Sequence, residues 1–309
     1  MRESTVLATP YPFTDLTEFD FDTFLECKPY LASKDEQIIT QIAQNVLEAF
    51  DPNQTSMHIL DIGSGNAKII NKVCRRLHQD LTHKPFHECR ISVDCIEPCS
   101  DGIKLIQQVA IEAEGAKTLL RPQQIAIEDF LSGGGRLYDA IVCCHMLYHI
   151  ELKNWKCVLD GLMNALRPGG VLVVNLVSRQ SDIYRVQDEI ESAKDRANLP
   201  KMHTRYGYEY FAEDLENVLY QIGHTWERQI ISADITFSKG DVLEAMEVLQ
   251  DKNNNSSLLH FLAFMFRLRH DDLLAIGKTK LLELLVPVSE GITFKSIDKM
   301  FVFRRKNTV

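Results

Sequence analysis

The chain has 309 residues, of which 45% are hydrophobic and 25% are charged, and its formal net charge is −9. This length allows one large core or a core with a sizeable appended region, and the acidic balance argues against a nucleic-acid groove or an anionic membrane surface as the partner. Because no run of about 18 apolar residues occurs and the N-terminus has no apolar signal-peptide stretch, we expect no membrane span and a cytoplasmic protein.

The first third of the chain changes from helical spacing to an alternation of strands and helices. Ile38, Ile42 and Val46 recur on one face of a helix that ends near Phe50. The expected strands then cover residues 56–63, 89–98, 123–131, 138–147 and 171–178. The 123–131 segment is expected as a short strand with a turn. The expected helices between the strands cover residues 66–80, 100–115 and 153–170, the last closed by Pro168, Gly169 and Gly170.

After Ser178 the pattern loosens. We expect a polar helix at 179–200, a helix that ends at Gly223, a strand at 224–237, a helical segment at 240–285 that the polar run 251–257 interrupts, and a last strand at 296–306.

This alternation predicts an α/β fold: a Rossmann-like, seven-stranded, mostly parallel sheet with helices on both faces, plus a smaller substrate-binding region. We expect three segments, namely an N-terminal helical cap at 1–55, a cofactor-binding core at 56–178, and a substrate-binding region with the final strands at 179–309. Ligands of such sheets bind at the carboxyl ends of the strands.

Cysteine usage favours a reducing compartment. None of the eight cysteines forms a C-x-x-C pair, and several stand in apolar runs, where a free thiol behaves as a small hydrophobe. The histidines and cysteines near residues 83–99 match no zinc spacing. We therefore expect neither a disulfide framework nor a metal site.

The stretch LDIGSGNAK, residues 60–68, indicates a ligand held close to bare backbone. A dinucleotide fingerprint would need a third glycine, where this chain has Lys68, so an NAD-dependent oxidoreductase is disfavoured. Glu97 ends the second strand of the alternation, and a carboxylate there can accept both hydroxyls of a ribose.

Four segments together resemble the signature motifs of class I S-adenosylmethionine-dependent methyltransferases: ILDIGSGNAKII, DCIEP, YDAIVCCHMLYHI and LRPGGVLVVNL. The resemblance implies that the glycine loop lies against the methionine part of the cofactor, that Glu97 holds the ribose, that Glu128 or Asp129 lies near the adenine, and that Cys144 lies under its ring. The cofactor-binding residues expected on this basis are Asp61, Gly63, Ser64, Gly65, Glu97, Pro98, Glu128, Asp129 and Cys144.

A narrower resemblance extends beyond the cofactor half. YLASKDEQ, CCHMLYHI, LVVNLVSRQSDIYR, YFAEDLENVLYQIGHTWERQIISADIT and GITFKSIDKMFVF are similar to segments of the histamine N-methyltransferase family, in the same order. That resemblance implies a small-amine substrate and a pocket that includes Glu36, His145, His149, Gly207 and Ser296. Only Glu36 matches the family residue in kind, so the scaffold carries over better than the substrate.

The residues themselves suggest how an amine would be methylated. An amine nucleophile must lose its proton, and histidine titrates close to neutral pH. His145 and His149 are four residues apart, a spacing that places them on one face of a helical turn. We therefore expect His145 as the catalytic base, Glu36 as a second catalytic residue that orients the substrate, and Tyr148 and Tyr208 as aromatic walls. The expected substrate-binding residues are Glu36, His145, Tyr148, His149, Tyr208 and Ser296.

Two alternatives stay open. His145 could activate a hydroxyl or carboxylate acceptor instead of an amine, or the chain could be a catalytically silent domain that binds the cofactor. The expected partners are a small-molecule acceptor and S-adenosyl-L-methionine, without nucleic acid or membrane, in a monomeric protein. The run CCHM replaces the N-P-P-Y type of motif of enzymes that methylate amide or nucleobase nitrogen, so those substrates are disfavoured.

Overall fold

A computed structural model gives the architecture of the chain and describes residues 21–51, 53–82, 89–114, 117–133, 135–182, 184, 210–223, 225–248 and 291–306. The strands are β1 Ser56–Ile62, β2 Arg90–Ile96, β3 Thr118–Gln123, β4 Tyr138–Cys144, β5 Leu166–Val177, β6 Trp226–Ser238 and β7 Gly291–Arg304. The helices are α1 Phe21–Ala49, α2 Lys68–Thr82, α3 Ser100–Glu114, α4 Ile127–Ser132, α5 Leu152–Ala165, α7 Ala212–Ile222 and α8 Lys239–Val248, with a 3₁₀ turn, η2, at Leu147–His149.

The seven strands form one sheet in the order β3-β2-β1-β4-β5-β7-β6. β1 to β5 pair in parallel, whereas β7 lies antiparallel to both β5 and β6. The predicted Rossmann-like, mostly parallel sheet is therefore confirmed. The strand order reverses between β1 and β4, and ligands of open α/β sheets bind beside such a point, at the carboxyl ends of the strands.

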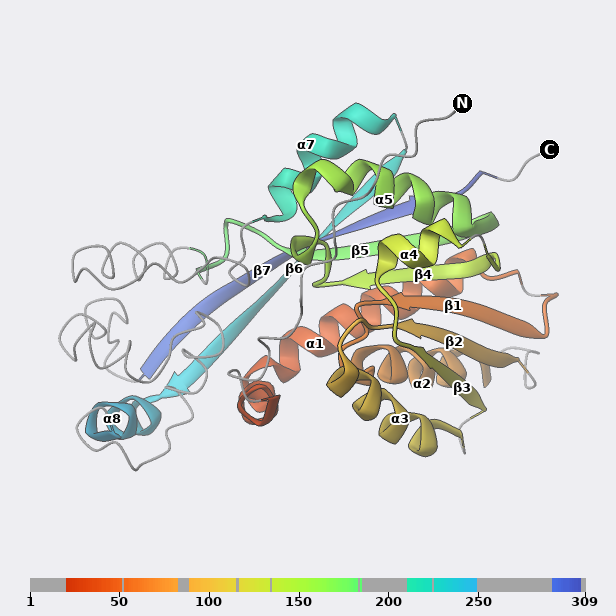
Figure 1. Cartoon of the computed structure of the whole chain (residues 1–309). Coiled ribbons are helices and arrows are strands. Elements are labelled where there is room, and N and C mark those ends of the chain that lie inside the picture. Colours follow the sequence, from red (N-terminus) through yellow and green to blue (C-terminus); the bar gives the residue numbers. More distant parts are fainter. Residues whose placement is uncertain are drawn as a thin grey trace.

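Helices cover the sheet on both faces (Figure 1). One core lies between the sheet and helices α1, α2 and α3, and includes Ile38, Ile42, Leu77 and Val93. The other lies between the sheet and α4, α5 and α7, and includes Trp155, Leu162 and Leu215. Burial on both faces explains why the parallel strands are nearly continuous apolar runs.

Several expected boundaries differ from the structure, and β7 begins at Gly291 instead of residue 296. The third strand is Thr118–Gln123, and most of the segment expected as a strand and turn forms α4 instead. β3 is the edge strand, where Pro122 removes no hydrogen bond that an inner strand would need. β5 already begins at Leu166, so the Pro-Gly-Gly run lies inside the strand, beside an irregularity in the β4–β5 pairing. Gly223 caps α7 with φ +67° as expected.

β6 and β7 form a long antiparallel pair that extends past the other strands toward α8 (Figure 1). Both strands belong to the 179–309 segment, so this part of the chain completes the sheet next to β5. The helices expected at 185–200 and at 251–285 lie outside the described residues. Within the described residues, no helix combines the length and apolarity that crossing a bilayer requires.

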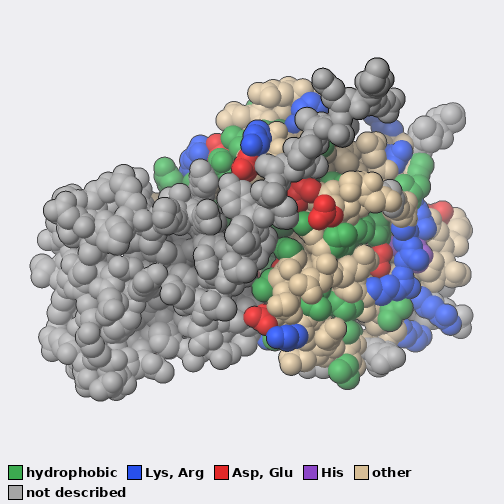
Figure 2. Space-filling view, in the orientation of Figure 1, with side chains coloured by type: hydrophobic (Ala, Val, Ile, Leu, Met, Phe, Trp, Pro, Cys, Tyr) green, Lys and Arg blue, Asp and Glu red, His purple; other side chains and the backbone are tan. Residues whose placement is uncertain are grey.

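Lysine and arginine side chains gather along the right-hand edge of the molecule in Figure 2. Arg121 and Arg136 pair with the buried Asp94, and Arg167 makes two hydrogen bonds to Asp139 near the start of β4. These cations compensate carboxylates that the fold removes largely from water.

Candidate active site

The loop after β1 allows a ligand to approach its backbone closely. Gly63 and Gly65 have φ values of +66° and +54°, in the region that favours glycine. A Cβ atom on Gly63 would lie 2.5 Å from the side chain of Met146, so this glycine lets the loop pack against the segment after β4. A Cβ on Gly65 would meet no atom within 4 Å. The chain thus leaves open space above bare backbone at Gly65.

Glu97 faces this loop from the end of β2. Its Oε2 accepts a hydrogen bond from the Gly65 N–H at 2.9 Å, and its Oε1 accepts one from the Cys99 N–H at 3.0 Å. A carboxylate has about four acceptor sites, so two remain for a ligand. Gly102 makes room for this side chain, because a Cβ there would lie 2.7 Å from Glu97 Cγ. A buried acid beside open space fits a ribose with two hydroxyl donors.

Asp61 is the second-last residue of β1, just before the loop, and is 6% exposed. Burial raises the pKa of its carboxyl to about 7, against an opposing hydrogen bond from Ser64, and the nearby Glu97 adds to the rise. Burial likewise raises the pKa of Glu97. Two adjacent buried acids fit a cation, because a positive ligand favours their charged forms.

The other expected cofactor residues line the neighbouring strand ends. Glu128 and Asp129 stand in the first turn of α4. The Pro98 carbonyl accepts a hydrogen bond from Gln124 Nε2 at 3.4 Å. Cys144 is the last residue of β4 and is partly exposed. These residues surround the carboxyl ends of β2, β3 and β4, the edge at which this class of sheet binds ligands.

His145 follows β4 in a left-handed backbone conformation, with φ +52°. Its N–H donates to the carbonyl of Asn175 on β5 at 2.9 Å, which fixes the backbone beside the neighbouring strand. A residue with a side chain rarely adopts this conformation, at a cost of about 1–3 kcal/mol, and such strain concentrates at functional sites.

The imidazole of His145 belongs to a buried polar cluster, which we call the His145 cluster: Lys34, His145, Asn175 and Asp298. His145 Nε2 lies 3.0 Å from Asp298 Oδ2, and Lys34 Nζ lies 2.8 Å from Asp298 Oδ1. Asn175 Nδ2 donates to Asp298 Oδ2 at 2.8 Å and lies 3.2 Å from His145 Nε2. Burial alone would raise the pKa of Asp298, but Lys34 and His145 outweigh it and hold that pKa well below its ordinary value. Asp298 is therefore an anion at neutral pH.

Three buried polar atoms in this region have neither a hydrogen-bond partner nor an ion-pair partner among the described residues: His145 Nδ1, Asn175 Oδ1 and Ser296 Oγ. Asn175, Ser296 and Asp298 are each 0% exposed. A buried polar atom without a partner costs about 1–3 kcal/mol. Such atoms are expected where a ligand completes the hydrogen bonding.

The structure separates the expected substrate residues. His145 and Tyr148 lie together, with ring centroids 6.5 Å apart, and the ring of His149 packs edge-on against Tyr148. Glu36 is not brought to the His145 cluster: its side chain is 60% exposed and pairs at 3.9 Å with Arg76 on α2. Tyr208, like Gly207, lies outside the described residues.

Sequence reasoning missed Lys34, Asn175 and Asp298. Each is a polar residue within an apolar pattern: Asn175 interrupts VLVVNLV, Asp298 precedes the apolar end of β7, and Lys34 lies on the buried face of α1 next to Ile38. Because buried polar residues need partners, these exceptions were the available signal.

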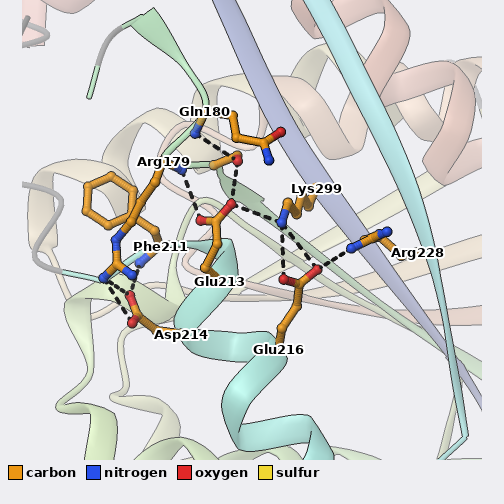
Figure 3. Close-up of polar contacts among 9 residues, drawn as sticks. Arg179, Gln180, Phe211, Glu213, Asp214, Glu216, Arg228 and Lys299 are labelled. Carbon is orange, nitrogen blue, oxygen red and sulfur yellow. Dashed lines mark hydrogen bonds and ion pairs between the residues drawn. The ribbon is translucent and has the colours of Figure 1, made fainter. Parts of the chain in front are cut away.

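A second polar cluster, which we call the Lys299 cluster, joins β7 to α7 and contains Arg179, Glu213, Asp214, Glu216, Arg228 and Lys299 (Figure 3). Lys299 Nζ lies 2.9 Å from Glu213 and 3.1 Å from Glu216, and Arg228 pairs with Glu216 at 2.7 Å. Glu213 also accepts the Arg179 N–H at 2.9 Å, and Arg179 pairs with Asp214. Burial would raise the pKa of Glu213, but the hydrogen bonds from Arg179, Ser178 and Lys299 lower it.

Within the described part of the chain, no three His, Cys, Asp or Glu side chains come together as a metal site would require.

Solved structures to which this chain is similar include two methyltransferases and a cyclopropane synthase. The plantazolicin methyltransferase BamL, in complex with a triazolic desmethylPZN analog and SAH, is 13% identical, with 94% of this chain and 91% of that chain covered and a TM-score of 0.47. The magnesium protoporphyrin IX methyltransferase ChlM from Synechocystis, with bound SAH, is 13% identical, with 71% and 90% covered and a TM-score of 0.48. A cyclopropane synthase from Mycobacterium tuberculosis is 14% identical, with 85% and 84% covered and a TM-score of 0.44.

Among curated proteins, no sequence matches this chain. The family model described as "Methyltransferase domain" matches residues 35–229, more than half of the chain. This match covers the glycine loop, Glu97, His145 and the parallel strands that carry them. The chain belongs to this methyltransferase family, and its cofactor is S-adenosyl-L-methionine.

Proposed function

We propose that this methyltransferase N-methylates a small amine or imidazole compound, with His145 as the general base. The observation that carries the proposal is the unpartnered, buried Nδ1 of His145 at the end of β4, beside the segment that packs on the glycine loop. A cofactor-binding domain without a reaction would have no need for such an atom in a strained residue.

The residues around the glycine loop bind the cofactor in this proposal. In this proposal Gly65 gives the cofactor access to the backbone, Glu97 accepts hydrogen bonds from the ribose, and Asp61 faces the positive end of the ligand. When bound, S-adenosyl-L-methionine supplies a methyl group on a sulfonium. The chain itself contributes orientation and exclusion of water, as an in-line displacement requires.

His145 removes a proton from the substrate ammonium. An amine substrate is mostly protonated at neutral pH and lacks a free electron pair. His145 Nδ1 accepts the proton from the ammonium, the N–H electron pair stays on nitrogen, and that nitrogen becomes the nucleophile. The proton then passes from Nδ1 to solvent, which restores the base.

An amine or imidazole suits this base better than an alcohol. Proton transfer to a histidine is efficient only when the acid strengths of donor and acceptor are comparable, and an alkylammonium is a much stronger acid than an alkyl hydroxyl. Asn175 Oδ1 and Ser296 Oγ are further buried oxygens without partners among the described residues, and they could accept hydrogen bonds from N–H donors. The acidic net charge also suits a cationic substrate.

The experiment is transfer of a labelled methyl group from S-adenosyl-L-methionine to a panel of purified acceptors. The panel contains histamine, simple primary amines, a phenol and a carboxylic acid. We expect transfer to at least one amine or imidazole, and none to the oxygen acceptors. Transfer only to oxygen would overturn the amine assignment, and S-adenosylhomocysteine binding without any transfer would favour a silent domain.

A further inference from the structure

We propose that Lys34 and Asp298 form a positioning pair that fixes the proton of His145 on Nε2 and leaves Nδ1 as the proton acceptor. This inference rests on the proposed function, because it explains how His145 becomes the base. Neither residue touches a reacting atom in this account. Each acts on the reaction through the imidazole.

The geometry around Nε2 selects the tautomer. Asp298 Oδ2 lies 3.0 Å from Nε2, and a carboxylate oxygen can only accept a hydrogen bond. If Nε2 carried a lone pair, two acceptors would face each other at this distance inside the core. A proton on Nε2 removes that repulsion and turns the contact into a charge-assisted hydrogen bond. The lone pair of a neutral imidazole then lies on Nδ1, the atom without a partner among the described residues.

Asn175 is compatible with this assignment. Its Nδ2 carries two hydrogens, one of which is used by the 2.8 Å bond to Asp298 Oδ2. The other lies on the side of Cys144 Sγ, at 3.9 Å. Asn175 therefore needs no acceptor at His145 Nε2.

Lys34 keeps Asp298 from taking the proton of His145. An isolated buried carboxylate would favour its neutral form. Lys34, 7% exposed on α1, lies 2.8 Å from the other carboxylate oxygen and compensates its charge. The pair is then neutral as a whole, so it orients His145 without holding the imidazole permanently as a cation.

The register of the sheet brings His145, Asn175 and Asp298 together from distant parts of the sequence. Cys144 pairs with Asn175 across β4 and β5, and Val177 pairs with Asp298 across β5 and β7. α1 packs on this face of the sheet and delivers Lys34. Among the described residues, Asp298 from β7 and Tyr148 from η2 lie beside the imidazole, and Lys34 from α1 pairs with Asp298. Cys144, the residue before His145, interacts electrostatically with Asp298, Asp61, Asp35 and Cys143.

The test is nitrogen-15 NMR of histidine-labelled full-length protein, saturated with S-adenosylhomocysteine. The chain has ten histidines, and the signals missing in His145→Gln identify the residue. We expect the neutral form of His145 to carry its proton on Nε2. A proton on Nδ1, or a fully protonated imidazole at pH 7 to 8, would overturn the proposal.

Two variants test the positioning pair. Asp298→Asn replaces the acceptor at Nε2 by an amide that can also donate, so the neutral imidazole should no longer be confined to the tautomer with its proton on Nε2. In Lys34→Met that tautomer should persist, but the nitrogen-15 shift of Nε2 should change because its acceptor has lost the compensating cation. The double variant Lys34→Met/Asp298→Asn should show the tautomer mixture of Asp298→Asn. Lys299→Met, on the opposite face of β7, is the matched control and should leave the His145 signals unchanged.

A structural role alone would destabilise the variants without changing these signals. An unchanged tautomer in Asp298→Asn together with an unchanged Nε2 shift in Lys34→Met would therefore overturn the positioning role. Should either single variant fail to fold, the tautomer of the wild type and that of the double variant still test the positioning role. The NMR result is independent of the methyl-transfer assay on the acceptor panel. Failure of all amines with the expected tautomer would reject the proposed function, whereas amine transfer with a proton on Nδ1 would reject only this inference.

Discussion

Asp298 and Lys299 are neighbours on β7, yet they anchor clusters of different character on opposite faces of the sheet. Successive side chains of a strand point to opposite sides, so Asp298 meets Lys34 and His145, and Lys299 meets Glu213 and Glu216. The acids of the Lys299 cluster are multiply paired. The His145 cluster instead lies in a region where three buried atoms lack partners among the described residues.

The polar groups of the Lys299 cluster have a structural role, whereas those of the His145 cluster have the features of a binding site. Completed ion pairs and hydrogen bonds, as around Lys299, hold α7 against the sheet and leave nothing for a ligand. Incomplete hydrogen bonding in the core is costly and persists where binding completes it. Substitutions in each cluster and in the cofactor loop test this difference.

His145→Gln should lower the rate of methyl transfer by roughly 100- to 10,000-fold, the usual contribution of a general base. Affinity for S-adenosylhomocysteine should stay within about twofold, because the substitution leaves the glycine loop unchanged. Steady-state kinetics on the best amine of the panel, together with isothermal titration, measures both quantities. Lys299→Met is the control, and an equal loss of rate there would remove the distinction between the clusters.

Lys34→Ala should destabilise the protein by about 3–5 kcal/mol, because it leaves the Asp298 carboxylate buried without its cation. Arg179→Ala, in the Lys299 cluster, should cost less than about 1 kcal/mol, since the Arg179 side chain is 41% exposed. Urea unfolding measures both changes. Equal losses would show that the buried Lys34–Asp298 pair contributes no more to stability than the more exposed Arg179–Asp214 pair. Lys34→Met/Asp298→Leu should recover most of the stability, because it removes both charges.

Asp61 predicts a pH dependence of stability. Its pKa rises from an ordinary value of 3.8 to about 7 in the folded chain, so between these pH values the folded state keeps a proton that the unfolded state has lost. The free energy of unfolding should therefore fall as pH rises from about 4 to about 7, by roughly 2–4 kcal/mol for this group. Above pH 7 the loss is complete.

Asp61→Asn should remove that part of the pH dependence and weaken binding of S-adenosylhomocysteine, whose ammonium would lose an anionic partner. Urea midpoints at pH 5 and pH 8 for the cofactor-free protein measure the first effect. An identical pH dependence in the variant and the wild type would contradict the assignment.

Glu97→Ala should weaken S-adenosylhomocysteine binding by about 1–3 kcal/mol, as expected for lost hydrogen bonds to a charged group. Gly102→Ala should act in the same direction, because its new Cβ would push against Glu97 Cγ. Isothermal titration measures both. An effect on amine affinity alone would place the ribose elsewhere.

The sequence predicted the parts of the molecule that local patterns encode. The glycine loop and the acid after β2 are contiguous motifs, and the strands other than β3 lie near their expected places. β3 was misplaced because Thr118–Gln123, an edge strand, carries Pro122 and Gln123 and lacks a strong apolar run.

The His145 cluster could not be assembled from sequence, since it joins α1, β4, β5 and β7 through the pairing register. Glu36 illustrates the difficulty. It is two residues from Lys34 on α1, and such residues point to nearly opposite faces of a helix. Helical phase therefore buries Lys34 and exposes Glu36, although a carboxylate is chemically the better partner for an amine.

The most direct test of the account is a crystal structure of the protein with S-adenosylhomocysteine and the amine that the panel selects. We predict that the amine nitrogen lies within hydrogen-bond distance, about 3 Å, of His145 Nδ1. The opposite face, around Lys299, should be unchanged. A water molecule on Nδ1, with the amine bound elsewhere, would contradict the claim that the incomplete face of β7 is the reaction site.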